Sequence, residues 1–282
     1  MLAETRRRLL LELIAQHGFA ALDQLVRTLG VSESTIRRDL EALDAAGAVK
    51  RTHGGAVLLG EVRAMPALED RAGTAWPQKR AIGRTAAALV EDGDSVLLDG
   101  GTTTLEVARA LVGRPVQVVT NSLPIANLLA ASPETDLILI GGYIYPRTGV
   151  ALGPMAIAAM ADIRVQKAIL GAGGIVADGI YNSNLLLVET ERQMMASGRE
   201  VVIVADRSKF GRQALARLCG LDAVQHLVVD PDLPEADREL LESAGVAIHE
   251  AALKPEPVES PSPSTLPKNG TVRHNGASRS EA

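Results

Sequence analysis

Cysteine is almost absent from this chain of 282 residues, since Cys219 is the only one. A single thiol excludes an intrachain disulfide and a thiolate metal cluster. The five histidines are scattered without the spacing of metal ligands, so we expect no metal and no other cofactor. Aromatic residues make up 2% of the chain. This scarcity argues against a protein that stacks the bases of single-stranded nucleic acid on aromatic side chains.

Long apolar runs are also missing. No run is long enough to span a bilayer. The first fifteen residues are partly basic, but Glu4 and Glu12 interrupt them, and neither the apolar stretch nor the cleavage site of a secretory signal follows. The simplest expectation is a soluble, cytoplasmic protein that does not bind a membrane.

The composition otherwise suits a globular protein with a large core, because 46% of the residues are hydrophobic. The length allows one large domain with a small one, or two domains of medium size. A formal net charge of -5 argues against a uniformly basic surface. Residues 1–57 are less acidic than the rest, with eight Lys or Arg against seven Asp or Glu, so a local basic patch remains compatible with the charge.

The stretch at residues 31–40, VSESTIRRDL, carries the clearest local pattern. Ser32 is a good N-cap because its hydroxyl can accept a bond from a first-turn N–H, and Glu33 suits the positive end of the helix dipole. One face of the predicted helix is apolar, with Ile36, Leu40 and Leu43. The opposite face carries Ser34, Arg37 and Arg38. Such a helix can read the major groove; the alternative is an ordinary amphipathic helix with solvated arginines.

The flanking segments favour the first interpretation. Apolar residues at 9–14 share one helical face, and Gly18 ends that helix. A short helix follows at 22–29, so three short helices joined by tight turns predict a helix-turn-helix that stops at Gly47. Residues 48–57 then predict two short strands around a glycine turn, which is a wing.

Residues 31–40, together with the later His53-Gly54-Gly55-Ala56, resemble the winged helix-turn-helix of the DeoR family of bacterial transcriptional regulators. The resemblance implies that double-stranded operator DNA is a partner. It also implies DNA contacts by Ser34, Thr35, Arg37, Arg38, Arg51 and His53. Asp39 is expected to be structural and to orient a neighbouring arginine.

The pattern changes after a linker at 58–77, and short apolar runs then alternate with helical stretches. The strands are expected at 96–98, 116–119, 137–140, 168–170, 201–205, 227–229 and 246–248. Nearly continuous apolar strands separated by helices predict a parallel sheet with helices on both faces. The domains are therefore expected at 1–57 and 78–251, followed by a proline-rich, disordered tail at 252–282 to which we assign no function.

Glycines and small polar residues follow five of these strands, where a parallel sheet places its ligands. The motifs are Asp99-Gly100-Gly101-Thr102-Thr103-Thr104, Thr120-Asn121-Ser122, Gly141-Gly142, Gly171-Ala172-Gly173-Gly174 and Asp206-Arg207-Ser208-Lys209. Backbone N–H groups at a helix start, hydroxyls and a lysine can together hold a phosphate or a carboxylate. Each motif alone is also a common turn former, but five that converge predict a pocket.

This half of the chain resembles the DeoR-family sensor domain, which shares its fold with ribose-5-phosphate isomerase, glucosamine-6-phosphate deaminase and CoA transferases. The resemblance implies that the pocket binds a phosphorylated sugar. The residues carried over by motif are Asp99, Gly101, Thr102, Thr103, Thr120, Asn121, Gly141, Gly142 and Lys209, with Lys79 and Arg147 as additional candidates.

One segment departs from the family pattern. Many members carry two adjacent basic residues near the start of the helix after the fourth strand, and this chain has Glu191-Arg192 there. The polar stretch at 181–184 precedes it. Both segments either line the pocket or an interface, or form a solvated loop and helix.

The combined motifs predict a sequence-specific DNA-binding regulator. We expect a repressor of carbohydrate-metabolism genes that is controlled by a phosphorylated sugar and acts as a homo-oligomer, a dimer or a tetramer. The alternative is a sugar-phosphate isomerase or deaminase with an accessory DNA-binding domain. We do not expect an enzyme, because the second domain shows no clear set of carboxylate and histidine residues for proton transfer.

Overall fold

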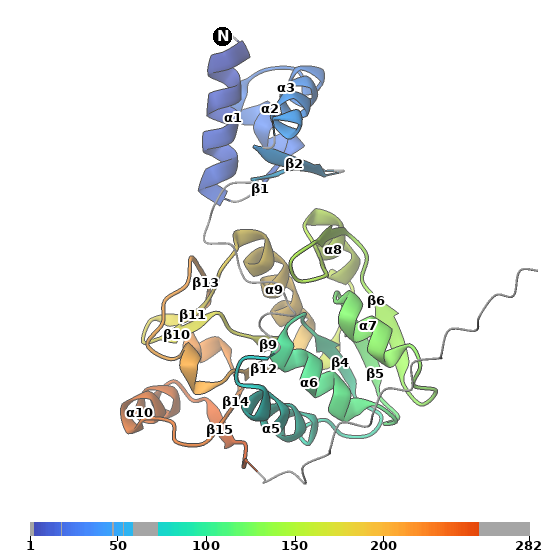
Figure 1. Cartoon of the computed structure of the whole chain (residues 1–282), viewed down its shortest axis with the longest axis vertical. Helices are drawn as coiled ribbons and strands as arrows, with labels where there is room; N and C mark the ends of the chain where they lie inside the picture. Colours follow the sequence, from blue (N-terminus) through green and yellow to red (C-terminus); the bar gives the residue numbers. More distant parts are fainter. Residues whose placement is uncertain (1–2, 18, 47, 53, 59–72, 254–282) are drawn as a thin grey trace, which may run out of the picture.

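The N-terminal part of the chain is a winged helix-turn-helix (Figure 1). The structure is a computed structural model that describes residues 3–17, 19–46, 48–52, 54–58 and 73–253. The elements of this first domain are α1 (Ala3–His17), β1 (Phe19–Ala21), α2 (Leu22–Leu29), α3 (Glu33–Ala45), β2 (Val49–Thr52) and β3 (Gly55–Leu58). The predicted helices and the predicted wing are confirmed.

The turn between α2 and α3 depends on Gly30, whose φ of 64° is a left-handed conformation that favours glycine. The small core is built from α1, α2 and α3, with Leu10, Ile14, Leu25, Ile36 and Leu40 buried. The strand β1 was not predicted; it pairs antiparallel with β3, so the wing is a three-stranded sheet in the order β1-β3-β2. The predicted helix end at Gly47 lies outside the described residues.

The second domain is organised around a parallel sheet of seven strands (Figure 1). The strands are β4 (Ser95–Leu98), β5 (Gln117–Thr120), β6 (Asp136–Leu139), β9 (Val165–Gly171), β12 (Gly198–Val204), β14 (His226–Val229) and β15 (Ala247–Glu250). All seven were predicted. The sheet order is β15-β14-β12-β9-β4-β5-β6, so the chain builds outward in one direction from β4 and then in the other from β9.

Alternate residues of each strand face opposite sides of the sheet, and each side has its own core. On β4, Val96 and Leu98 lie in one cluster and Leu97 in the other. The helices of the domain are α5 (Trp76–Ala87), α6 (Thr102–Leu111), α7 (Leu123–Leu129), α8 (Pro154–Met160), α9 (Leu185–Ser197) and α10 (Glu235–Ser243). Residues of α5, α6 and α7 join the first cluster, and residues of α8, α9 and α10 join the second.

Two small antiparallel elements complete the domain. The hairpin of β7 (Tyr143–Tyr145) and β8 (Val150–Leu152) follows β6. The sheet of β10 (Gly174–Val176), β11 (Gly179–Asn182) and β13 (Ala216–Cys219) is paired in that order. These five short strands were not predicted, and the second set forms part of the cavity wall described below.

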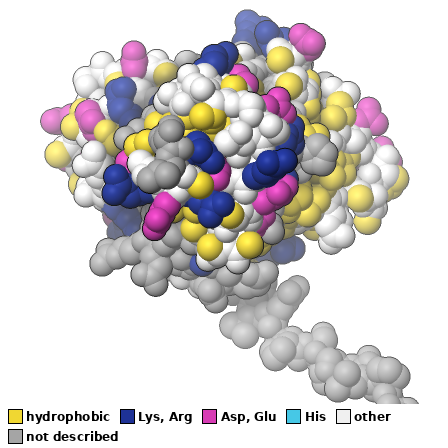
Figure 2. Space-filling view, turned by 90° about the horizontal axis from the view of Figure 1, so that it is seen from above, with side chains coloured by type: hydrophobic (Ala, Val, Ile, Leu, Met, Phe, Trp, Pro, Cys, Tyr) yellow, Lys and Arg dark blue, Asp and Glu magenta, His cyan; other side chains and the backbone are white. Residues whose placement is uncertain are grey.

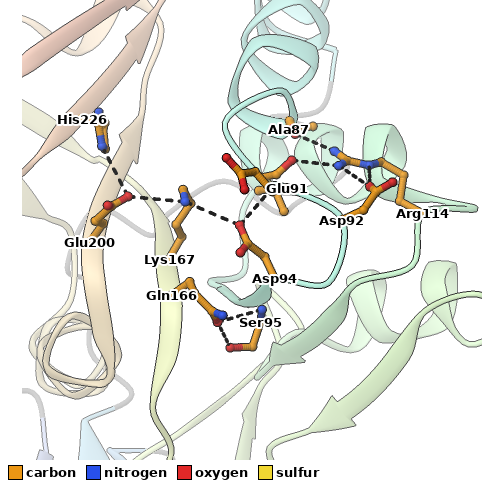
Figure 3. A network of polar contacts seen from close by, with 11 residues as sticks. Ala87, Glu91, Asp92, Asp94, Ser95, Arg114, Gln166, Lys167, Glu200 and His226 are labelled. Carbon is orange, nitrogen blue, oxygen red and sulfur yellow. Dashed lines mark hydrogen bonds and ion pairs between the residues drawn. The ribbon is translucent and has the colours of Figure 1, made fainter.

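An ion-pair network crosses the amino ends of four neighbouring strands (Figure 3). His226 Nε2 lies 3.5 Å from Glu200 Oε2, and Lys167 Nζ bridges Glu200 and Asp94 at 3.4 and 3.5 Å. These residues belong to β14, β12, β9 and the turn before β4. The network therefore links the amino ends of these strands. The cavity described below lies at the opposite end of the sheet, over the carboxyl ends.

The first helix of the second domain, α5, begins at Trp76, two residues before the start predicted for that domain at 78. The linker residues 59–72 and the tail beyond 253 lie outside the described residues. Among the helices that are described, none is both long enough and apolar enough to cross a membrane.

Candidate functional sites

The first candidate site is the exposed N-terminal half of α3. Ser32 caps the helix, since its hydroxyl accepts from the Thr35 backbone N–H at 3.3 Å. The same hydroxyl lies 3.0 Å from Ser34 Oγ and 2.8 Å from Thr35 Oγ1. The predicted cap is therefore present, and the predicted contact residues Ser34 and Thr35 form one hydroxyl cluster at the end of the helix that can meet a phosphate.

The arginines of this surface differ in their partners. Arg37 pairs with Glu33 one turn earlier at 2.7 Å, and Arg51 of the wing pairs with Glu41 at 2.8 Å. Arg38 is exposed and takes no side-chain partner within the described part of the chain. Exposed pairs contribute only about 0–1 kcal/mol, so phosphates can replace the carboxylates at little cost. The predicted contact residue His53 lies outside the described residues.

The underside of α3 is anchored to α1 through Asp39, which is 2% exposed. Arg6 donates to its Oδ2, and Arg7 Nε donates to its Oδ1 at 3.0 Å. The expected structural role of Asp39 therefore has a specific form: its arginine partners come from the first helix. This clamp fixes the angle at which α3 presents its outer face.

Charge on this end of the molecule is local. Figure 2 looks down on the end that carries the N-terminal domain, and Lys and Arg gather there in patches that alternate with Asp and Glu. This distribution agrees with the near balance of charges in residues 1–57. A groove-facing helix with a few arginines fits such a surface better than a general polyanion-binding face does.

The second candidate site is a cavity of about 560 Å³ in the sensor-like domain. It lies over the carboxyl ends of β4, β9 and β12, which are adjacent in the sheet. The sheet order reverses between β4 and β9, and such a switch point is where doubly wound sheets bind ligands. The cavity therefore lies where the topology of the sheet predicts a site.

One part of the cavity wall is suited to an anion. Gly100 and Gly101 lead into α6, and the first turn of α6 at residues 102–104 lines the cavity without a side-chain cap on its backbone N–H groups. Lys79, Lys209 and Arg212 also line the cavity, and Lys79 is buried. Helix-start N–H groups and converging cations together form a phosphate or carboxylate site.

Another part of the wall is polar and less charged. Asn182 and Ser183 at the end of β11 line the cavity. Asn182 Nδ2 donates to Glu191 Oε1 on α9. Burial and the nearby charge of Asp99 raise the pKa of Glu191 well above its usual value, although the bond from Asn182 lowers it. The raised pKa favours the neutral acid at Glu191.

A single carboxylate is among the lining residues. Asp206 is buried at the end of β12, and its Oδ1 accepts from the backbone N–H of Ser208 at 3.1 Å and from the Ser208 hydroxyl. These bonds cap the short helical turn Arg207–Lys209, which carries Lys209.

The structure brings together only some of the predicted ligand residues. Gly101, Thr102, Thr103 and Lys209 line the cavity, as does the additional candidate Lys79. Asp99 is buried directly before the Gly100-Gly101 turn and close enough to Glu191 to affect its pKa.

Five of the nine predicted residues are not among those that line the cavity: Asp99 and four residues at or just after the ends of β5 and β6. The additional candidate Arg147 is exposed and does not line it either. Thr120 Oγ1 donates to the Leu98 carbonyl at 2.7 Å, and Asn121 Nδ2 donates to the Ala151 carbonyl at 3.1 Å. Gly141 and Gly142 follow β6, the outermost strand on that side of the sheet. These residues lie beyond β4, on the side away from β9 and β12.

Other lining residues carried weaker signals in the sequence. Thr74 precedes α5, Asn182 and Ser183 belong to the polar stretch whose role was left open, and Arg212 follows the Lys209 loop. The positions of Asn182 and Ser183 depend on the antiparallel strand β11, which pairs with β10 and β13. Arg192 points elsewhere, since its Nε donates to the Leu218 carbonyl at 3.0 Å.

A groove-reading helix joined to an α/β domain with an anion-suited cavity defines the class of ligand-responsive transcriptional regulators. Comparison with protein families agrees: the DeoR-like helix-turn-helix domain matches residues 6–62, and the DeoR C terminal sensor domain matches residues 75–231. The chain belongs to the DeoR family of DNA-binding transcriptional regulators.

Individual relatives support the same family. The glycerol-3-phosphate regulon repressor of Escherichia coli (strain K12) is 33% identical over 234 residues, which cover 82% of this chain and 92% of the relative. The HTH-type transcriptional regulator UlaR of Escherichia coli O1:K1 is 29% identical over 245 residues, covering 86% and 97%.

A partial likeness to solved structures is also found. Ribose 5-phosphate isomerase A from Methanocaldococcus jannaschii is 19% identical, with a TM-score of 0.34, and the match covers 47% of this chain and 53% of that one. A likeness of this extent says nothing about the activity of this chain.

Proposed function

We propose that this chain is a repressor of carbohydrate-metabolism genes whose operator affinity is controlled by a phosphorylated sugar. The observation that carries the proposal is the cavity: the uncapped start of α6, with Lys79, Lys209 and Arg212, forms an anion site in a chain that also carries a groove-reading helix. The relative that is a regulon repressor supports repression, and not activation, of the regulated genes. The ligand acts through different affinities for the DNA-competent and DNA-incompetent states.

We propose further that the active species is a homo-oligomer, a dimer or a tetramer. A single winged helix-turn-helix reads one half-site, and a palindromic operator requires two copies related by a twofold axis. Sedimentation of the full chain tests this part: a monomer at the concentrations that give specific DNA binding contradicts it.

The alternative, a sugar-phosphate isomerase or deaminase, is less well supported. Proton transfer between carbons requires a positioned base. Asp206 is the carboxylate among the described lining residues, and it is committed to Ser208. A coupled assay with ribose 5-phosphate and glucosamine 6-phosphate tests this point, and turnover of either would reinstate the enzyme.

The test of the regulator is a gel shift with DNA from upstream of the protein's own gene, at a stated salt concentration, with and without a panel of sugar phosphates. We expect a specific shift that one compound alters. A specific shift that no compound alters removes the proposed effector class. The absence of a specific shift at low salt contradicts the regulator itself.

A further inference from the structure

The wall of the cavity at the end of β11 contains a chain of buried polar groups outside the anion site. Asn182 is 7% exposed and Glu191 is 1% exposed. The Asn182 amide donates from Nδ2 to Glu191 Oε1, and its Oδ1 accepts from the Ser183 backbone N–H at 2.8 Å. The side chain of Asn182 is therefore held from both ends while it lines the cavity.

We propose that Asn182 and Ser183 form the subsite that recognises the hydroxyl groups of the effector, and that Glu191 is the positioning residue that orients the Asn182 amide. The proposal rests on the proposed function, because it assigns the uncharged part of the same ligand. The ligand class is a phosphomonoester of a hydroxylated carbon chain, with its phosphate at the start of α6.

Hydrogen-bond capacity supports the role of Asn182. An asparagine side chain has two N–H donors and two lone pairs on its oxygen. Within the described residues, one donor is used by Glu191 and one lone pair by Ser183. One donor and one acceptor remain for the cavity, and a ligand hydroxyl both donates and accepts.

The orientation of the amide depends on Glu191. If the amide were rotated by a half turn, its NH₂ would face the Ser183 backbone N–H, which is a repulsive contact, and the bond from Nδ2 to Glu191 Oε1 would be lost. The Ser183 N–H and Glu191 together therefore select which edge of the amide the ligand meets. In this respect Glu191 acts on the ligand through Asn182 and not by direct contact.

The hydroxyl of Ser183 provides an independent observation. Ser183 Oγ is buried and has no hydrogen-bond partner in the part of the chain that the structure describes. A buried polar group without a partner is destabilising, and Ser183 is one of the residues that line the cavity. A ligand hydroxyl at this wall would satisfy it.

The local electrostatics favour an uncharged group at this wall. Asp99 and Glu191 are both buried and lie close enough for the charge of Asp99 to affect Glu191. A second anionic group of the ligand would be repelled by the charge of Asp99. The phosphate is attracted instead to the helix start and the cations of the anion site.

The test compares ligands that differ in hydroxyl groups, using isothermal titration calorimetry on the full chain. Inorganic phosphate and propyl phosphate carry the anion without hydroxyls. The hydroxylated set comprises sn-glycerol 3-phosphate, ribose 5-phosphate and glucose 6-phosphate. The measured quantity is the preference, the ratio of the Kd of propyl phosphate to the Kd of the best hydroxylated ligand. We expect a preference of about tenfold or more in the unmodified chain.

Three variants test whether this preference comes from Ser183 and from the Asn182 amide that Glu191 orients. Ser183→Ala removes the unpartnered hydroxyl and should lower the preference about three- to tenfold. Glu191→Ala should lower it to a similar extent, while Glu191→Gln, which keeps an acceptor for Asn182, should restore it to within about twofold. Glu239→Gln, at an exposed glutamate of α10, is the matched control and should change nothing. Binding of inorganic phosphate should remain the same in every variant.

The outcomes separate the two proposals. If no phosphate compound binds the unmodified chain, the proposed function fails and the subsite fails with it. If phosphate compounds bind but hydroxylated ones show no preference, or if Ser183→Ala retains the full preference, the subsite is overturned while the anion site stands. Ser183→Ala decides even if Glu191→Ala fails to fold, because Ser183 Oγ makes no bond within the described residues.

Discussion

At the scale of single residues, we expect DNA recognition to depend most on Arg38, an exposed arginine of α3 that no described side chain pairs. Arg38→Ala should raise the Kd for the operator by about tenfold or more, equivalent to ~1–3 kcal/mol if the guanidinium reads a guanine. Fluorescence anisotropy at several salt concentrations measures this. If Arg38 contacts phosphate instead, the dependence of log K on log salt should flatten by about 0.9.

The matched control is Arg27→Ala on α2, where an exposed arginine pairs with Asp23 at 2.7 Å. This variant should bind the operator as the unmodified chain does. An unchanged Kd for Arg38→Ala would contradict the docking of α3 in the groove.

Asp39 should matter for stability more than for contact. Asp39→Ala removes the buried carboxylate that Arg6 and Arg7 of α1 contact. We expect the free energy of unfolding of the first domain to fall by about 2–3 kcal/mol, because a buried ion pair loses one member. Hydrogen exchange of amides in α1 and α3 measures the change.

The control for Asp39 is Asp23→Ala, because Asp23 pairs with Arg27 on the surface. Loss of this exposed pair should cost no more than about 0.5 kcal/mol. Equal effects of the two substitutions would show that the clamp between α1 and α3 does not hold the domain together.

At the scale of elements, we expect His226 at the amino end of β14 and His249 in β15 to link stability to pH. His226 Nδ1 lies 3.1 Å from His249 Nε2, and His226 Nε2 lies 3.5 Å from Glu200 Oε2, which Lys167 also contacts (Figure 3). Burial, and then the charge of His226, lower the pKa of His249 below its usual value of 6.5. Protonation of His249 is therefore weaker in the folded chain than in the unfolded chain.

The sign of the pH effect follows. The unfolded chain binds more protons between the lowered pKa and 6.5, so the free energy of unfolding rises with pH across this window and levels off above 6.5. His249→Gln should remove this part of the slope, as measured by urea unfolding from pH 4.5 to 7.5. A slope that persists unchanged in His249→Gln would assign it to other groups.

The sequence predicted the main elements but not the small ones. The seven parallel strands are short apolar runs such as Val96–Leu98, which burial on both faces requires, so they were recognisable. The strands β1, β7, β8, β10, β11 and β13 are three or four residues long and mixed in character. The strands β1 and β13 pair with strands distant in the chain, which a local pattern does not reveal. The pairs β7–β8 and β10–β11 are local hairpins, but their strands are too short to show a clear alternation.

Only part of the candidate cavity was predicted. The sequence showed which residues follow the carboxyl ends of the strands, but it did not show the order of the strands in the sheet. Because β5 and β6 lie on the far side of β4, Thr120 and Gly141 do not reach the cavity over β4, β9 and β12. Asn182 reaches it from β11, whose pairing was not predicted.

At the scale of the whole molecule, the anion site should control DNA binding without contributing to it. Lys209→Ala removes a cation from the cavity wall. We expect the concentration of effector needed to alter operator binding to rise about tenfold or more, while operator affinity without effector stays the same. Arg199→Ala, an exposed cation at the amino end of β12, is the control and should leave both quantities unchanged.

An anisotropy titration of operator DNA with the full chain is the most direct test of ligand-controlled DNA binding. It is run at fixed salt, with and without the phosphorylated sugar that binds best, on the unmodified chain and on Lys209→Ala. We expect a specific Kd for DNA that the ligand changes in the unmodified chain, and a much smaller change at the same ligand concentration in the variant. Equal changes in both chains would contradict the assignment of the cavity. Failure to bind operator DNA specifically at low salt would contradict the regulator as a whole.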